Sequence, residues 1–181
     1  MKNNPLVYRL TIITAILVII SGTLLHFAYD FFHESFWVGF VAPVNESVWE
    51  HLKLAFFPLL IFGVLEYPIL KNKVSNFWLA LFAECFFSVI FILVFFYSYT
   101  SFTKESILAL DISSFILAII FAKMLSYKIL TRKGAVKKSA SWPAYLILLL
   151  LLFFIIATLS PPRTKLFEDP VTHTFGIYRN F

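Results

Sequence analysis

The chain has 181 residues, of which 60% are hydrophobic and 14% are charged, and its mean hydropathy is +0.86. Soluble domains are about 45–50% apolar and about 25% charged, so this composition excludes a soluble globular domain, a disordered chain and a disulfide-rich scaffold. The single cysteine, Cys85, excludes an internal disulfide. The net charge of +5 does not indicate nucleic-acid binding, because the basic residues stand between apolar runs. The composition predicts an all-α integral membrane protein.

Five apolar runs are long enough to cross a bilayer, which takes roughly 20 residues per helix. They are predicted at residues 8–29, 52–70, 76–98, 106–126 and 142–160. The first run is interpreted as a retained span rather than a signal peptide, because no small residue stands three positions before Ala28. The sequence therefore predicts a bundle of five transmembrane helices in one domain over residues 1–181, with an extracytoplasmic interfacial tail at residues 161–181.

The basic residues are divided unevenly between the two sides of these spans. One side carries ten of them, which are Lys2, Arg9, Lys71, Lys73, Lys123, Lys128, Arg132, Lys133, Lys137 and Lys138. The other side carries five, which are Lys53, Lys104, Arg163, Lys165 and Arg179. Positive charge in short loops favours the cytoplasmic side, so we expect a cytoplasmic N-terminus and an extracytoplasmic C-terminus in a plasma membrane. All four histidines then lie toward the outer face, where we expect any chemistry.

A group of polar residues follows the first span at the spacing i, i+3, i+4 and i+7, and it comprises His26, Tyr29, Asp30 and His33. If the helix continues through them, they form one polar stripe. His26 and Asp30 are predicted ligands for a divalent metal ion such as zinc, and Tyr29 is a candidate substrate-binding residue. The alternative is a polar stripe that is hydrogen-bonded to headgroups and water at the membrane interface.

A second group opens the second span, where Ser47 and Glu50 have the spacing of a capping box. In that motif the serine accepts a backbone N–H and the glutamate bonds back to the N–H of the serine, which is one explanation for Glu50. Capping leaves Glu46 and His51 unexplained. We predict Glu46, Glu50 and His51 as catalytic residues and His51 also as a metal ligand. Lys53 either pairs with one of the glutamates or binds an anionic headgroup.

About a dozen mostly apolar residues, 34–45, join the two groups. We expect this segment to form a short interfacial or re-entrant hairpin that brings the two helix ends together. The sequence therefore predicts one outer pocket, built from His26, Asp30, Glu46, Glu50 and His51. Two histidines and a carboxylate with an open water position form the usual ligand set of a hydrolytic metal site, although this spacing does not match a zinc motif such as His-Glu-x-x-His.

Ionisable residues inside the apolar runs are functional candidates, because burying them in a bilayer is costly. Glu84 is expected either to pair with Lys123 or to be protonated, and a structural hydrogen bond between helices is the alternative. Asp111 is expected to reach the histidines of the outer pocket. Glu66 is interpreted as an ion-pair partner of the lysines that follow it.

The tail mixes turn-forming residues with charged and aromatic ones. In one interpretation it is a lid that supplies Arg163, Asp169 or His173 to the outer pocket. In the other it is a tether on the membrane surface without chemistry. Arg163 is also a candidate for binding an anionic headgroup.

A resemblance draws attention to the same residues. The residues that carry it are Pro43 to Lys53, His26 with Tyr29 and Asp30, and the tail from residues 166–170 through Gly176 and Ile177. Its most specific part is the string Asn-Glu-Ser-x-Trp-Glu-His-x-Lys at residues 45–53. In these segments, and over nearly its whole length, the chain resembles a family of small bacterial multi-pass membrane proteins that is catalogued as a domain of unknown function. The resemblance implies a bacterial source and brings no established reaction. His33 and His173 lie outside the pattern of that family.

We therefore expect a metal-dependent hydrolase or acyl transferase that acts on a lipid or lipid-linked substrate entering from the bilayer. His26, His51 and one acid would hold the ion, a remaining glutamate would act as general base, and Lys53 or Arg163 would bind the headgroup.

Two other functions remain open. One is a small transporter or a proton- or ion-conducting subunit that uses Glu84, Asp111 and His26. The other is a non-enzymatic membrane protein that binds a partner. The lipid bilayer is an expected partner in every case, nucleic acid is not, and the sequence leaves the oligomeric state open.

Overall fold

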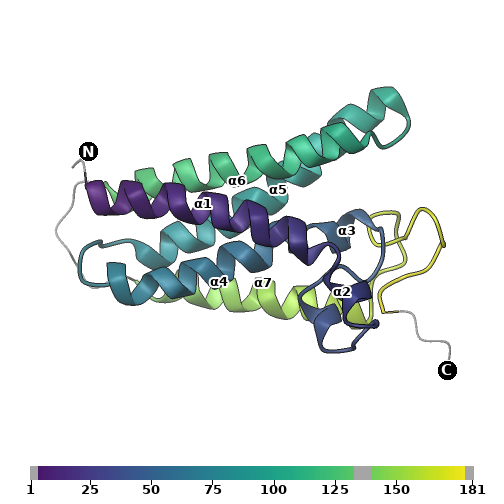
Figure 1. Cartoon of the computed structure of the whole chain (residues 1–181), viewed down its shortest axis with the longest axis horizontal. Coiled ribbons are helices and arrows are strands. Elements are labelled where there is room, and N and C mark those ends of the chain that lie inside the picture. Colours follow the sequence, from purple (N-terminus) through teal and green to yellow (C-terminus); the bar gives the residue numbers. More distant parts are fainter. Residues whose placement is uncertain (1–3, 133–139, 178–181) are drawn as a thin grey trace.

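The computed structural model describes residues 4–132 and 140–177, and these residues form a bundle of helices (Figure 1). The helices are α1 (Pro5–Leu25), α2 (Ala28–Phe31), the 3-10 helix η1 (Val38–Phe40), α3 (Val48–His51), α4 (Lys53–Leu70), α5 (Phe77–Thr103), α6 (Leu108–Leu130) and α7 (Trp142–Leu159). Some residues used in the sequence analysis lie outside the described ranges, namely Lys2, Lys133, Lys137, Lys138 and the last four residues of the tail, which include Arg179.

Five helices are long and apolar enough to cross a membrane: α1, the run from Val48 to Leu70, α5, α6 and α7. This confirms the prediction of an all-helical protein with five such helices. Only 22% to 50% of the residues in their apolar windows are buried within the bundle. Many large apolar side chains on these helices are exposed, as expected where helices face lipid tails. The protein is a multi-pass membrane protein.

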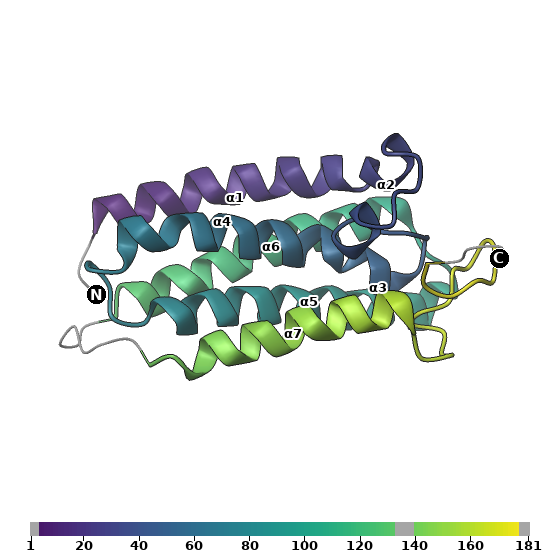
Figure 2. The ribbon, with the colours of Figure 1, turned by 90° about the horizontal axis from the view of Figure 1, so that it is seen from below.

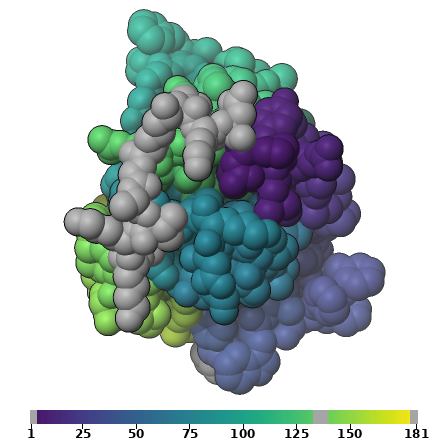
Figure 3. All heavy atoms as spheres, turned by 90° about the vertical axis from the view of Figure 1, so that its left-hand side faces the viewer, coloured from purple at the N-terminus to yellow at the C-terminus, as the bar shows by residue number. Residues whose placement is uncertain are grey.

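The long helices run side by side along the long axis of the molecule (Figures 1 and 2). α5 packs against α4, α6 and α7, and α1 packs against α4 and α6. Figure 3 looks onto the end of the bundle at which α1 begins. The short elements α2, η1 and α3 gather at the opposite end together with residues 161–177 (Figure 1). We call this second end, formed by residues 26–51 and 160–177, the hairpin end.

The start of α1 follows the rules of helix capping. The side chain of Asn4 accepts hydrogen bonds from the backbone N–H groups of Leu6 and Val7, and Pro5 occupies the first helical position, where its missing N–H is not needed. Within the helix, the hydroxyl of Thr14 donates to the carbonyl of Leu10 at 2.8 Å. Such bonds satisfy polar side chains on a helix that contacts lipid.

The end of α1 differs from the prediction. The backbone N–H of Phe27 donates to the carbonyl of Leu24, only three residues back, so the α-helical pattern stops and the separate short helix α2 follows. His26 caps α1, whereas Tyr29 and Asp30 belong to α2. One helix through all four residues was the condition for the polar stripe, and the structure does not meet that condition.

An aromatic core anchors α3 and α4 to α7 at the hairpin end. The ring of Phe154 stacks on Phe56 with centroids 4.4 Å apart and on Trp49 with centroids 4.7 Å apart. Phe167, from the segment after α7, packs against Trp49, with 4.8 Å between the two ring centroids. Burial of large rings in this arrangement is strongly favourable, so this core fixes the position of α3 and of the residues that flank it.

Candidate functional site

Three polar side chains meet at the hairpin end. His26 caps α1, Glu46 precedes α3 and His51 ends α3, and one ligand atom from each lies within 4.8 Å of the others. The two imidazole rings are 5.2 Å apart between centroids. The side chains of Glu46 and His51 are 56% and 31% exposed, so the cluster opens to the surroundings of the bundle. The sequence analysis expected these three residues to share a pocket, and the structure brings them together.

The ring of His51 is held in one orientation. Its Nδ1 lies 2.9 Å from the carbonyl oxygen of Ser47, one turn earlier in the chain. Because a carbonyl only accepts hydrogen bonds, Nδ1 carries the hydrogen. Nε2 then faces Glu46, with 3.4 Å between it and the carboxylate oxygen Oε2. In neutral His51, Nε2 therefore carries a lone pair that can bind a metal ion. Backbone carbonyls commonly orient metal-binding histidines in this way, by accepting the hydrogen of the other ring nitrogen.

Glu46 is kept ionised by its neighbours. When His51 is protonated, its Nε2–H donates to this carboxylate. That hydrogen bond lowers the pKa of the Glu46 carboxyl below its ordinary value, and charge interactions with His51 and His26 act in the same direction against partial burial. The backbone N–H of Glu46 donates to Asp169 Oδ2 at 3.1 Å, which ties this residue to the C-terminal segment. Glu46 thus presents an anionic, exposed carboxylate beside two imidazoles.

Asp169 is buried and does not point into the cluster as a lid residue would. It accepts backbone N–H groups from Val171 at 2.7 Å, from Thr172 at 3.0 Å and from Glu46. Burial alone would raise the pKa of Asp169, but the backbone hydrogen bonds from Thr172, Val171 and Glu46 outweigh it, so the pKa is lowered. Asp169 therefore positions the chain around Glu46.

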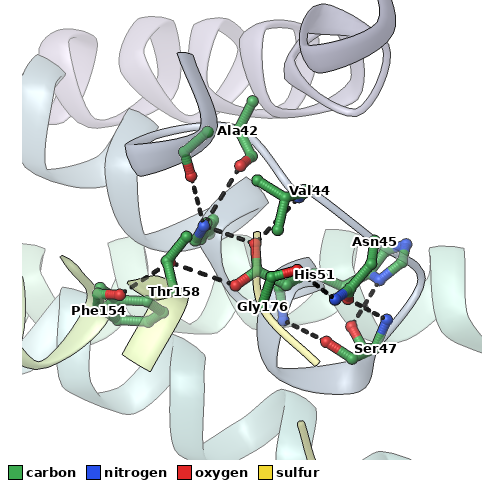
Figure 4. A network of polar contacts seen from close by, with 11 residues as sticks. Ala42, Val44, Asn45, Ser47, His51, Phe154, Thr158 and Gly176 are labelled. Carbon is green, nitrogen blue, oxygen red and sulfur yellow. Dashed lines mark hydrogen bonds and ion pairs between the residues drawn. The ribbon is translucent and has the colours of Figure 1, made fainter. Parts of the chain in front are cut away.

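Beside the cluster lies a buried ion pair between Glu50 and Lys53. Figure 4 shows the network of polar contacts in this region. The ammonium group of Lys53 donates to the carbonyls of Gly39 at 2.8 Å and Ala42 at 3.3 Å, and to Glu50 at 2.5 Å. An ammonium has three hydrogens, so all of them are used. Lys53 is completely buried. The prediction that it binds an anionic headgroup is therefore corrected: it holds the hairpin segment to the start of α4.

Glu50 is also fully engaged. Besides Lys53 it accepts the backbone N–H of Val44 at 3.0 Å and the hydroxyl of Thr158 at 3.3 Å (Figure 4). The capping box is formed only in part, because Ser47 caps the N–H of Glu50 while its own N–H donates to Asn45 rather than to Glu50. With its carboxylate buried and hydrogen-bonded on both oxygens, Glu50 is not available as a general base.

The other residues predicted around the pocket have different surroundings. Asp30 is exposed and is not part of the three-residue cluster. Tyr29 is buried and lies against Gly39. Arg163 is exposed in the segment that follows α7. His173 pairs with Glu168 at 2.8 Å on the surface of the tail.

The two intramembrane acids have separate partners. Glu84 pairs with Lys123 at 3.2 Å, which is one of the two predicted alternatives. Asp111 accepts the hydroxyls of Tyr99 at 2.5 Å and Ser106 at 2.6 Å, and its charge also acts on His51, so it lies near the cluster without being one of its three ligand residues. Glu66 lies 4.0 Å from Lys123 instead of pairing with the lysines that follow it.

Comparison with known proteins agrees with the resemblance seen in the sequence. The model of a family of unknown function (DUF6512) matches residues 1–177. The chain belongs to this family. No curated protein and no solved structure gave a significant match. For this member of the DUF6512 family, the chemistry must therefore be inferred from the geometry of the hairpin end.

Several groups that shape the site in this DUF6512 protein were missed by sequence reasoning. The carbonyls of Ser47, Gly39 and Ala42 are backbone groups, which carry no residue signal. Thr158 stands in an apolar run and gives only a weak signal as a lone hydroxyl. Asp169 is one of the residues that the lid interpretation assigns to the pocket, and only the fold shows that its carboxylate instead accepts backbone hydrogen bonds, one of them from Glu46.

Proposed function

We propose that this multi-pass membrane protein binds a divalent transition-metal ion, zinc above all, between His26, Glu46 and His51. The metal-bound water would hydrolyse a lipid or lipid-linked substrate, or take part in acyl transfer from it. The observation that supports this proposal is the approach of the three ligand atoms to within 4.8 Å of one another. Two imidazole nitrogens and one carboxylate oxygen bind zinc in many hydrolytic sites, where a water molecule takes the open position.

The surroundings of His26 add a second reason for an ion. Its Nδ1 is buried, and no group among the described residues forms a hydrogen bond with it. A buried polar atom without a partner is costly, and a bound ion or its water would remove that cost. Tetrahedral zinc with bonds of about 2.0–2.1 Å sets neighbouring ligand atoms about 3.3 Å apart. The 3.4 Å between His51 and Glu46 fits that spacing, so mainly His26 would have to move inward.

The place of the cluster favours a substrate from the bilayer. It lies at the hairpin end, where the long apolar helices end (Figure 1). Phe31 and Trp37, from the segment between α1 and α3, are 74% and 76% exposed and offer an apolar surface to lipid. We propose that this end faces outward from a bacterial plasma membrane, because the basic residues are concentrated in the connections at the other end.

The proposal assigns two roles differently from the sequence analysis. Glu46 takes the place of Asp30 as the carboxylate ligand. Glu50 and Lys53 have a structural role next to the site. Their carboxylate and ammonium groups are buried and hydrogen-bonded to the protein, so neither group can exchange a proton with a substrate. Arg163 stays the candidate for an anionic headgroup because it is exposed.

Metal binding is tested by elemental analysis of the detergent-purified protein after reconstitution with zinc. His26→Ala and His51→Ala are compared with the wild type and with His173→Ala, a matched control whose histidine also pairs with a glutamate but lies outside the cluster. We expect about one zinc per chain in the wild type and the control, and its loss in the other two variants. Equal metal contents in all four proteins would contradict the proposal.

The hydrolytic step is tested separately with a fluorogenic phospholipid in detergent micelles. The zinc-loaded wild type should release the fluorophore, and His51→Ala should not. If the protein binds zinc at the cluster but leaves both this phospholipid and lipid-linked acyl donors unchanged, the proposed metal site stands and the proposed enzymatic activity is contradicted.

A further inference from the structure

A second polar centre lies inside the bundle, far from the histidine cluster. It is formed by Glu66 on α4, Glu84 on α5 and Lys123 on α6, with exposed fractions of 8%, 2% and 3%. Glu66 follows His51 by fifteen residues, or roughly 20 Å along a helix that rises 1.5 Å per residue. We call these three residues the buried triad.

The charges of the buried triad do not balance if every group is ionised. The ammonium of Lys123 lies 3.2 Å from Glu84 Oε1 and 4.0 Å from Glu66 Oε1, so one cation faces two carboxyl groups. Among the described residues, Cys85 also interacts electrostatically with Lys123, but it is a buried thiol that carries no charge at neutral pH. Two carboxylates would leave one uncompensated negative charge in an apolar interior, which is strongly unfavourable.

The hydrogen bonds show which carboxyl group lacks support as an anion. Glu84 accepts a hydrogen bond from Lys123. Glu66 Oε1 is buried, and none of the described residues donates a hydrogen bond to it. The side chain of Glu66 is also 11% exposed, against 3% for Glu84 and 4% for Lys123, so it forms the accessible edge of the triad.

We propose that the buried triad is a proton-binding site in which the carboxyl groups of Glu66 and Glu84 together hold one exchangeable proton beside the ammonium of Lys123. With that proton the triad is neutral, and without it the triad has a charge of minus one. The three residues stand within about two turns of the ends of α4, α5 and α6 at the side where α1 begins, so the proton exchanges with that side of the membrane. This site is independent of the proposed metal centre.

Infrared spectroscopy of the protein in lipid nanodiscs at neutral pH tests the proposal through the C=O stretching band of a protonated carboxyl group. Glu66→Gln, which keeps the size of the side chain, should abolish the band of the triad. Glu84→Gln should abolish it as well, because the remaining glutamate becomes the anionic partner of Lys123. Lys123→Met should increase the band about twofold, because both acids must then be neutral. Glu105→Gln, an exposed control, should leave it unchanged.

Two results would overturn the proposal. One is a band that survives in Glu66→Gln or that does not grow in Lys123→Met. The other is a band that is absent from the wild type in sodium buffer and appears when choline replaces sodium, which would mean that a metal cation balances the charge. Size-exclusion chromatography of each variant checks that it is folded.

Discussion

The carboxylate of Glu50 lies 2.5 Å from the ammonium of Lys53, one helical turn further along the chain, and both groups are buried at the hairpin end. This ion pair connects three parts of the molecule. Lys53 binds the carbonyls of the segment before α3, and Glu50 binds Thr158 near the end of α7. The histidine cluster is therefore built on a rigid support whose own charges are satisfied by the protein.

Removing one partner of this ion pair should destabilise the protein severely. Lys53→Met leaves the carboxylate of Glu50 buried without its cation, and we expect the free energy of unfolding to fall by about 3–5 kcal/mol. Adding Glu50→Gln to Lys53→Met should restore part of that loss, because no unpaired charge remains. Thermal unfolding in detergent, with the exposed Lys104→Met as control, measures both effects. A Lys53→Met protein as stable as the control would show that the pair has no structural role.

The link between the tail and Glu46 should depend on the charge of Asp169. Because the pKa of Asp169 is lowered in the folded protein, its contribution to stability is complete above the unfolded value of about 3.9 and is lost as the pH falls through the folded value. At neutral pH, Asp169→Asn should imitate this loss and make local opening of residues 161–177 easier by about 1–3 kcal/mol.

Hydrogen exchange of the tail amides checks this effect of Asp169→Asn. Glu168→Gln is the neighbouring control, because that carboxylate pairs with the exposed His173. If the amides of Val171 and Thr172 exchange equally fast in the two variants, the carboxylate of Asp169 does not hold the tail in place.

The long helices and the meeting of the two histidines can be predicted from the sequence for physical reasons. A bilayer requires about 20 apolar residues per helix regardless of what packs around them, so the five runs are visible without a structure. The short, mostly apolar segment at residues 34–45 favours a chain that folds back at the membrane surface, which is why the sequence predicts that His26 and His51 lie near each other. These two constraints act locally along the chain.

The roles of the acids could not be predicted, because they depend on partners far away in the sequence. Glu50 is free to bind Lys53 and Thr158 only because Asn45 supplies the acceptor for the N–H of Ser47. Asp30 is separated from the cluster by a break in helical hydrogen bonding after His26 that periodicity does not reveal.

Zinc binding should weaken as the pH falls, and the titration of histidine should set the range. Because the pKa of Glu46 is lowered by its hydrogen bond with His51, this carboxylate stays ionised in mildly acidic solution and does not limit binding. Each histidine that must lose a proton costs about tenfold in affinity per pH unit below its pKa, which is ordinarily about 6.5. Titration calorimetry at about pH 7.5 and about pH 5.5 measures the difference. An affinity independent of pH over this range would exclude imidazole ligands.

The position of His26 should depend on Gly22, one turn earlier in α1. A Cβ atom at Gly22 would meet the backbone carbonyl of Leu54 and the ring of Phe115. The carbonyl belongs to α4 and cannot turn away, so Gly22→Ala should push α1 off α4, lower stability by about 1–3 kcal/mol and weaken zinc binding. In the control Gly63→Ala, the three atoms nearest to the added Cβ all belong to the side chain of Leu81 rather than to a backbone. Equal zinc affinities in the two variants would show that the helix contact does not position His26.

The orientation of the protein in the membrane can be determined by labelling introduced cysteines with a thiol reagent. Cys85 is buried, so the wild type should not react with a membrane-impermeant maleimide. Asn72→Cys and Glu105→Cys place exposed thiols in the α4–α5 and α5–α6 connections, at opposite ends of the bundle, without removing a basic residue. With the hairpin end outward, intact cells should label Glu105→Cys at once and Asn72→Cys only after permeabilisation. The reverse pattern would place the histidine cluster in the cytoplasm, where the same metal site would serve an intracellular substrate.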